Sequence, residues 1–151
     1  ASLVGSEMCI RDRKETALQL KEHSMTFDNR LPADIQVKGN QSLLYSVFRN
    51  LTDNAIAYAG EGSAITLSAE KTSQQEWRFT FSDNGVGVPN EHLARLFERF
   101  YRVDKGRSRK MGGTGLGLAI VKNAILLHGG SVSVKNALPP NHGLIFTFTL
   151  K

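Results

Sequence analysis

The segment SLLYSVFRNLTDNAIAYA, residues 42–59, decides how this chain folds. Its apolar residues recur three and four positions apart, which predicts an amphipathic helix with one buried face. Gly60 and Gly62 end the pattern and stop the helix. Such a helix must bury its apolar face against another layer of the fold. The side chains predicted on that face are Leu44, Val47, Phe48, Leu51, Ala55 and Tyr58.

Alternating runs elsewhere in the chain predict the layer that receives this helix. Residues 65–70 and 77–82 alternate apolar with polar side chains and predict a hairpin covered on one face. We therefore expect an α+β two-layer sandwich, in which about three helices cover one face of a mixed, mostly antiparallel sheet. The other expected elements are helices over residues 13–23, 91–100 and 116–127, and strands over 25–29, 35–38, 131–135 and 144–150.

Composition indicates an ordinary globular domain. The chain has 151 residues, of which 40% are hydrophobic and 22% charged, and this excludes a disordered or collagen-like protein. A net charge of +5 is too modest to indicate a nucleic-acid partner. Cys9 is the single cysteine, so neither an internal disulfide nor a structural zinc site is expected. No apolar stretch approaches the roughly 20 residues that span a bilayer, and we expect a cytoplasmic location.

The first twelve residues differ from the rest of the chain. Residues 1–12, ASLVGSEMCIRD, show neither helical nor strand periodicity. We expect them to be a loose leader foreign to the fold, followed by a single domain over residues 13–151.

Two asparagines are predicted on the inward side of the long helix. Asn50 and Asn54 are four residues apart, so they lie one turn above each other beside the apolar face. Amides at the edge of such a face need hydrogen-bonding partners, and a hydrated metal with phosphates would supply them. The alternative is a pair of structural asparagines that are satisfied by the protein itself.

Two glycine-containing segments indicate close approach of a ligand to the backbone. Asp83 to Gly87, DNGVG, ends a predicted strand, and its carboxylate could accept from an exocyclic amine such as that of adenine. A tight turn with a capping aspartate is the alternative. Gly112 to Gly117, GGTGLG, opens the second long helix behind a basic loop, which favours a polyphosphate site over a solvated loop. A GK[ST] sequence does not follow and a strand does not precede, which excludes a P-loop and a dinucleotide fingerprint.

Four segments in this order resemble the sequence boxes of histidine kinases, and the resemblance extends over residues 13–151. The segments are FRNLTDNAIAY at 48–58, similar to the N box, DNGVG at 83–87, similar to the first glycine box, LFERFYR at 96–102, similar to the F box, and GTGLGLAIVK at 113–122, similar to the second glycine box. Their joint agreement outweighs the separate alternatives.

The resemblance implies the Bergerat ATP-binding fold, shared with type II topoisomerases, Hsp90 chaperones and MutL. It implies transfer of the ATP γ-phosphoryl group to a histidine on a separate dimerisation domain, and onward to a response regulator. The acceptor sequence of that domain is not found around His23, His92, His128 or His142, which we expect to be structural or solvated. We therefore expect this fragment, which lacks the dimerising hairpin, to be a monomer.

The resemblance also implies roles for individual residues. Asn54 would bind Mg²⁺, while Asn50 and Arg102 would be the catalytic residues at the phosphates. Tyr58 would stack on adenine and Asp83 would receive its amino group. Phe97 and Phe100 would anchor a lid over residues 101–112. The glycine boxes would shape the two ends of the ATP site through Gly85, Gly87, Gly113, Thr114, Gly115, Leu116 and Gly117.

Individual positions distinguish this chain from relatives of the same fold. ATP-hydrolysing members have a glutamate where this chain has Asn50, whose amide cannot act as a base, and this favours transfer over hydrolysis. Ala57 replaces the usual lysine or arginine, which leaves open a regulatory nucleotide-binding module without catalysis. A serine kinase of the anti-sigma type is the other alternative, and the F box argues against it.

Overall fold

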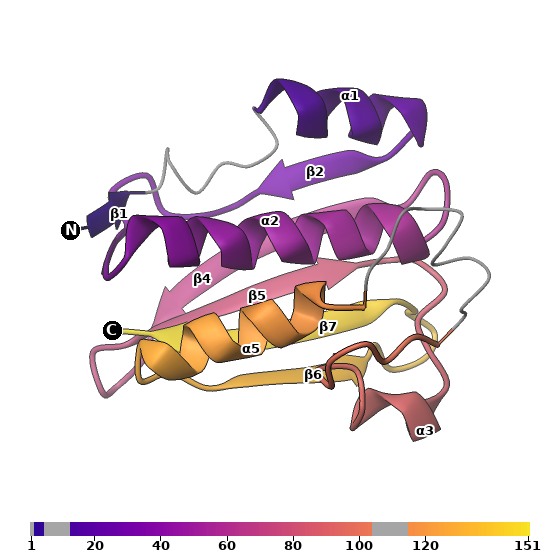
Figure 1. Cartoon of the computed structure of the whole chain (residues 1–151). Helices are drawn as coiled ribbons and strands as arrows, with labels where there is room; N and C mark the ends of the chain where they lie inside the picture. Colours follow the sequence, from indigo (N-terminus) through magenta and orange to yellow (C-terminus); the bar gives the residue numbers. More distant parts are fainter. Residues whose placement is uncertain (1, 5–12, 104–114) are drawn as a thin grey trace.

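The computed structural model describes residues 2–4, 13–103 and 115–151, and Figure 1 shows their arrangement. The helices are α1 (Lys14–Glu22), α2 (Gln41–Tyr58), α3 (Asn90–Leu93) and α5 (Gly117–Leu127), and the strands are β1 (Ser2–Val4), β2 (Thr26–Asn29), β3 (Gln36–Lys38), β4 (Ala64–Lys71), β5 (Trp77–Asp83), β6 (Val132–Asn136) and β7 (Leu144–Leu150). None of these helices is long and apolar enough to cross a membrane.

The main sheet is mixed, as the alternating runs predict. Among the described residues its strand order is β2-β4-β5-β7-β6, with β2 parallel to β4 and the other neighbours antiparallel. The β4–β5 hairpin is confirmed, and its register pairs Ile65 with Asp83. In Figure 1, α2 and α5 lie side by side on one face of the sheet, and α1 lies next to the edge strand β2. The α+β two-layer sandwich is therefore confirmed.

The long helix α2 is held at its start by a side-chain cap. Asn40 is the N-cap residue, and its Oδ1 accepts from the backbone N–H of Leu43 at 3.0 Å. The cap satisfies one of the donors that a helix leaves free at its first turn. The backbone N–H of Asn40 donates to Nε2 of His128 at 3.1 Å, and Nδ1 of the same ring contacts the carbonyl oxygen of Ala124 at 2.7 Å. His128 thereby ties the end of α5 to the start of α2.

Aromatic packing fixes α2 on the sheet. Phe48 of α2 meets Phe79 of β5 and Phe148 of β7 edge to face, with ring centroids 5.7 and 5.8 Å apart. The two strand rings are stacked at 4.9 Å with an interplanar angle of 4°. All three side chains are buried. Edge-to-face and stacked rings are the favoured geometries, so this triad sets the position of α2 over the central strands.

The segment before the basic loop is less helical than its sequence predicts. A helix is expected over residues 91–100, whereas α3 ends at Leu93. Beyond it the backbone hydrogen bonds join residues three apart, from Arg95 to His92 and from Glu98 to Arg95. Phe97 in this segment packs on Phe146 of β7, with 6.1 Å between ring centroids. We attribute the tighter turns to this packing on the sheet, which a regular α-helix over residues 91–100 would not allow.

The N-terminal residues also differ in part from expectation. Residues 1–12 are expected to be loose, but Ser2–Val4 form β1 and pair antiparallel with β3. Residues 1 and 5–12 lie outside the described part of the chain. The assignment of the domain to residues 13–151 stays a prediction.

Replacing Phe48 tests the aromatic triad. Phe48→Ala should lower the free energy of unfolding by about 3–5 kcal/mol, because it leaves a cavity against the two stacked rings of Phe79 and Phe148. Urea unfolding followed by circular dichroism measures the change. Leu138→Ala is the control, since Leu138 is 78% exposed and should change stability little. A loss below about 1 kcal/mol in Phe48→Ala would show that the triad does not hold α2.

Candidate functional site

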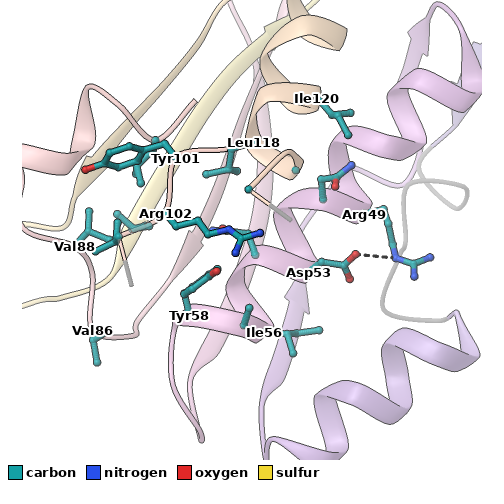
Figure 2. Close-up of a pocket in the computed structure, with 18 of the residues that line it drawn as sticks. Arg49, Asp53, Ile56, Tyr58, Val86, Val88, Tyr101, Arg102, Leu118 and Ile120 are labelled. Atoms are coloured by element: carbon teal, nitrogen blue, oxygen red, sulfur yellow. Dashed lines mark hydrogen bonds and ion pairs between the residues drawn. The ribbon is translucent and has the colours of Figure 1, made fainter. Parts of the chain in front are cut away.

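A cavity of about 750 Å³ lies between the later turns of α2, the start of α5 and the turn that follows β5 (Figure 2). Its volume is in the range of sites for small ligands. Residues from six separate segments of the sequence form its wall, and positions predicted to bind a nucleotide come from four of them. The predicted residues that line the cavity are Asn50, Asn54, Tyr58, Gly87, Arg102, Gly115 and Gly117.

The α2 wall carries the two asparagines. The side-chain amide of Asn50 donates to the carbonyl oxygen of Ser46 at 2.8 Å, so this N–H group is satisfied within the helix. Its Oδ1 lies against Gly117, where a Cβ atom would be only 3.0 Å away. Asn54 lines the cavity one turn further along. Asn50 therefore has the internal partner of a structural asparagine and also lies on the cavity wall.

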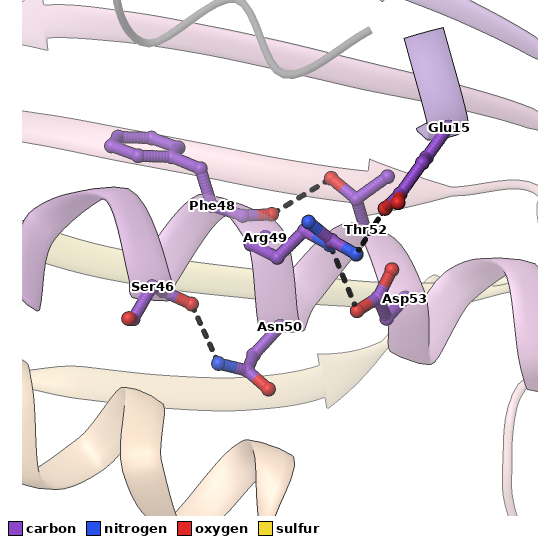
Figure 3. A network of polar contacts seen from close by, with 7 residues as sticks. All are labelled: Glu15, Ser46, Phe48, Arg49, Asn50, Thr52 and Asp53. Atoms are coloured by element: carbon purple, nitrogen blue, oxygen red, sulfur yellow. Dashed lines mark hydrogen bonds and ion pairs between the residues drawn. The ribbon is translucent and has the colours of Figure 1, made fainter. Parts of the chain in front are cut away.

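An ion-pair network beside the asparagines connects α2 to α1 (Figure 3). Arg49 contacts Asp53 of its own helix and Glu15 of α1, each at 3.2 Å between nitrogen and oxygen. Burial raises the pKa of the Asp53 carboxyl, and the charge of Arg49 opposes that rise. Both Arg49 and Asp53 line the cavity. The sequence analysis missed this pair, although its spacing of four residues is a helical ion-pair signal.

Asp83 lies behind the cavity wall at the end of β5. Its Oδ1 accepts from the backbone N–H of Gly85 at 2.9 Å and from that of Leu144 at 3.3 Å. Leu144 lines the cavity, whereas Asp83 and Gly85 do not. Burial raises the pKa of the Asp83 carboxyl, and the two backbone donors limit the rise. The partly desolvated carboxylate of Asp83 is thus hydrogen-bonded to Leu144, a residue of the cavity wall.

The turn after Asp83 is held by partners far away in the sequence. The carboxamide of Asn136 accepts from the backbone N–H of Val88 at 3.1 Å and donates to the carbonyl oxygen of Val88 at 2.6 Å. Nδ1 of His142 contacts the carbonyl oxygen of Gly85 at 2.8 Å. A Cβ atom at Gly85 would lie 2.2 Å from the carbonyl oxygen of Ala59, so only glycine allows this turn to pack on the end of α2.

Arg102 brings a cation to the cavity. Arg102 lines the cavity, and Figure 2 shows its side chain extending toward α2 above Tyr58. The backbone N–H of Phe100 donates to the carbonyl oxygen of Gly115 at 2.7 Å. Gly115 has a φ of +77°, which favours glycine. Gly113 and Thr114, together with most of the expected lid, lie outside the described residues.

Three other predicted site residues lie away from the cavity wall. Phe97 packs on Phe146 in the core, and Leu116 precedes the first turn of α5. The side chain of Phe100 is 63% exposed, while its backbone N–H holds Gly115. Its role as an anchor of the lid stays a prediction, because residues 104–114 lie outside the described part of the chain. Of the four histidines, His23 lines the cavity, which the sequence analysis did not foresee.

The chemistry of the wall suits an anionic ligand with a polar ring at its other end. Arg102 supplies positive charge, and the amide oxygens of Asn50 and Asn54 are hard donors. No cluster of three or more histidine, cysteine or acidic side chains that could hold a metal occurs among the described residues. Mg²⁺ keeps several waters and takes only one or two protein ligands beside substrate phosphates, so the donor set fits that ion.

Comparison with known proteins points to one family. The family model for histidine kinase-, DNA gyrase B- and HSP90-like ATPases matches residues 39–151. The chain is 39% identical to the sensor histidine kinase WalK of Bacillus subtilis over 132 residues, which are 86% of this chain and 21% of WalK. It is 38% identical to the sensor-like histidine kinase SenX3 of Mycolicibacterium smegmatis, covering 91% of this chain and 35% of SenX3. The chain thus spans a fifth to a third of the length of these relatives.

Solved structures show the same similarity. The mycobacterial sensor histidine kinase MprB superposes with a TM-score of 0.82 at 28% identity, covering 99% of this chain and 97% of that one. Full-length ShkA, in complex with AMPPNP, superposes with a TM-score of 0.78 at 25% identity, covering 99% of this chain and 30% of ShkA.

The raised pKa of Asp83 predicts a dependence of stability on pH. A carboxyl whose pKa is higher in the folded than in the unfolded chain lowers stability as pH rises from the unfolded value to the folded value, and the full cost remains at higher pH. Asp83→Asn removes this cost and keeps an oxygen acceptor, so it should raise the melting temperature at pH 7. The advantage should shrink as pH falls toward 3.8, the ordinary pKa of the carboxyl.

Differential scanning fluorimetry between pH 4 and 8, paired with Asp28→Asn as an exposed control, measures this effect. A variant Asp83→Asn that melts lower than the wild type at neutral pH would show that the carboxylate stabilises the fold instead.

Proposed function

The chain belongs to the family of histidine kinase-, DNA gyrase B- and HSP90-like ATPases, and we propose that it is the ATP-binding catalytic domain of a sensor histidine kinase. In this proposal it transfers the γ-phosphoryl group of ATP to a histidine on a separate helical dimerisation domain. The observation that carries the proposal is the convergence of predicted positions from four distant segments on one cavity. Similarity to sensor histidine kinases over 86% and 91% of the chain supports histidine as the acceptor.

The adenine ring occupies the end of the cavity near β5. Asp83 accepts from the exocyclic amine there, since its described backbone donors both reach Oδ1 and leave Oδ2 available. Asp83 is not itself on the cavity wall, so adenine must reach past the wall residues Leu144 and Gly87 to contact it. Tyr58 lines the same cavity from α2 and stacks on the ring.

The triphosphate lies between α2 and the start of α5. Asn54, which lines the cavity, would hold Mg²⁺, and the ion would offset the charge of the phosphates. Asn50 lines the phosphates, and Arg102 contacts the γ-phosphate and stabilises the charge that develops during transfer. Gly115 and Gly117 allow the backbone to approach the phosphate oxygens closely.

The nucleophile in this proposal comes from the partner domain. Asn50 stands where hydrolysing relatives have a glutamate, and its amide cannot deprotonate water. The partner's histidine attacks the γ-phosphorus, the bond to the β–γ bridging oxygen breaks, and ADP leaves. The phosphoryl group then passes to a response regulator. Because ATP is the proposed substrate, we also propose a cytoplasmic location for the domain.

Calorimetric titration with ATP tests the nucleotide site. Wild type should bind Mg-ATP more tightly than ATP in the presence of a chelator, because the metal offsets phosphate charge. Asn54→Ala should remove that dependence on Mg²⁺. Asp83→Asn should lower ATP affinity at least about tenfold, because its amide presents a donor to the adenine amine. Wild-type protein that binds neither form would contradict the proposed function.

Transfer of radiolabel from γ-labelled ATP tests the reaction itself. The probe is the cognate helical hairpin that carries the acceptor histidine, mixed with this chain. Label that appears on the hairpin and is lost in acid indicates phosphohistidine, and a His→Ala hairpin is the control. Acid-stable label would indicate a serine kinase, and binding of ATP without any transfer would favour a regulatory module.

A further inference from the structure

Arg102 depends on its backbone for its position. It lines the cavity, yet it forms no ion pair or side-chain hydrogen bond with another described residue. A long side chain without partners occupies many rotamers, and ordering it on a ligand lowers affinity. A fixed backbone next to Arg102 lowers the entropy that the guanidinium must lose on binding, so the contacts that fix this backbone increase the contribution of Arg102 to affinity. Two residues before Arg102, the backbone of Phe100 is held by its hydrogen bond to Gly115.

Tyr101, the residue directly before Arg102, is held by three contacts. Its hydroxyl is hydrogen-bonded to Nδ1 of His92 in α3. The guanidinium of Arg95 lies 4.4 Å from the centre of its ring, and that guanidinium is in turn paired with Glu98 at 2.8 Å. The backbone N–H of Tyr101 donates to the carbonyl oxygen of Glu98 at 3.2 Å. Tyr101 also lines the cavity beside Arg102, as Figure 2 shows.

The helix that holds Tyr101 is itself attached to the sheet. The carboxamide of Asn136 in β6 donates to Oδ1 of Asn90, the first residue of α3, at 2.9 Å. The same carboxamide holds Val88 in the turn after β5. Contacts thus run from β6 through α3 and His92 to Tyr101, and from there along the backbone to Arg102.

We propose that Tyr101, clamped by His92 and Arg95, is a positioning residue that holds Arg102 ready for the terminal phosphate of the nucleotide. The inference rests on the proposed function, because it takes ATP as the ligand. Tyr101 acts through Arg102 and makes no contact with phosphate. Its effect is therefore confined to nucleotides that carry a γ-phosphate, since only these reach Arg102.

The ratio of ATP to ADP affinity measures this effect. Arg102→Ala should lower the ratio about tenfold or more, because it removes a charged contact to the γ-phosphate. Tyr101→Ala should lower the ratio about two- to tenfold, the range expected when one long side chain must be ordered on binding. Tyr101→Phe keeps the ring under Arg95 and loses only the hydroxyl, so its ratio should fall between wild type and Tyr101→Ala. His92→Ala should match Tyr101→Phe.

Double variants separate positioning from general damage. In the Arg102→Ala background, Tyr101→Ala should leave the ratio unchanged, because there is no guanidinium left to position. Tyr45→Ala is the matched control, since its ring also carries an arginine, Arg13 at 5.0 Å, but does not line the cavity. Melting temperatures establish that each variant is folded. If Tyr101→Ala does not fold, Tyr101→Phe replaces it in the comparison of ATP and ADP affinities.

The outcomes separate three claims: the positioning role of Tyr101, the phosphate contact of Arg102 and the proposed function itself. If Tyr101→Phe and Tyr101→Ala weaken ATP and ADP equally, or if the effect persists without Arg102, then Tyr101 is merely structural and the inference is wrong. If Arg102→Ala itself leaves the ratio unchanged, the proposed role of Arg102 fails and the inference fails with it. If wild type binds neither nucleotide, the proposed function fails.

Discussion

The packing of Phe48 on the stacked rings of Phe79 and Phe148 is the contact on which the rest of the molecule depends. It fixes the rotation of α2 about its own axis, because the apolar stripe must face the sheet. Once that stripe is buried, Asn50 and Asn54 can lie only at its border, where the sheet no longer covers the helix. The cavity is therefore a consequence of how one amphipathic helix meets a sheet that it does not cover completely.

Close backbone approach defines the size of that cavity. Gly117 brings the start of α5 against Asn50, and Gly85 brings the turn after β5 against the end of α2. A Cβ atom at Gly85 would overlap the carbonyl oxygen of Ala59, so this wall cannot tolerate a side chain. Asn136 then fixes the same turn from β6 and anchors α3 with the other half of its carboxamide. Asn136 thus holds both the turn after β5 and the first residue of α3.

The site also contains groups that do not favour the folded state. Burial raises the pKa of Asp83 and of Asp53, which means that each carboxylate loses hydration on folding. Asp53 is compensated by Arg49, and Asp83 by two backbone donors. Polar groups that are only partly compensated are common where a protein must recognise a ligand. The aromatic core beneath them supplies the stability that such a site requires.

The sequence by itself determined the features that depend on neighbours along the chain. The periodicity of residues 42–59 and the alternation in β4 and β5 predict the sandwich. Each of the four ordered boxes contributes residues to one cavity, among them Asn50, Gly87, Arg102 and Gly117. Only the tertiary structure decided the partners of Asp83, Val88 and Tyr101. Asn136 lies 48 residues from Val88, and Leu144 lies 61 residues from Asp83. Such hydrogen bonds leave no local pattern, because their geometry exists only after the sheet has brought distant strands together. The same reason applies to Phe97 and Phe100, two phenylalanines of one short segment. Only the position of β7 determines that Phe97 is packed on the sheet while Phe100 is exposed.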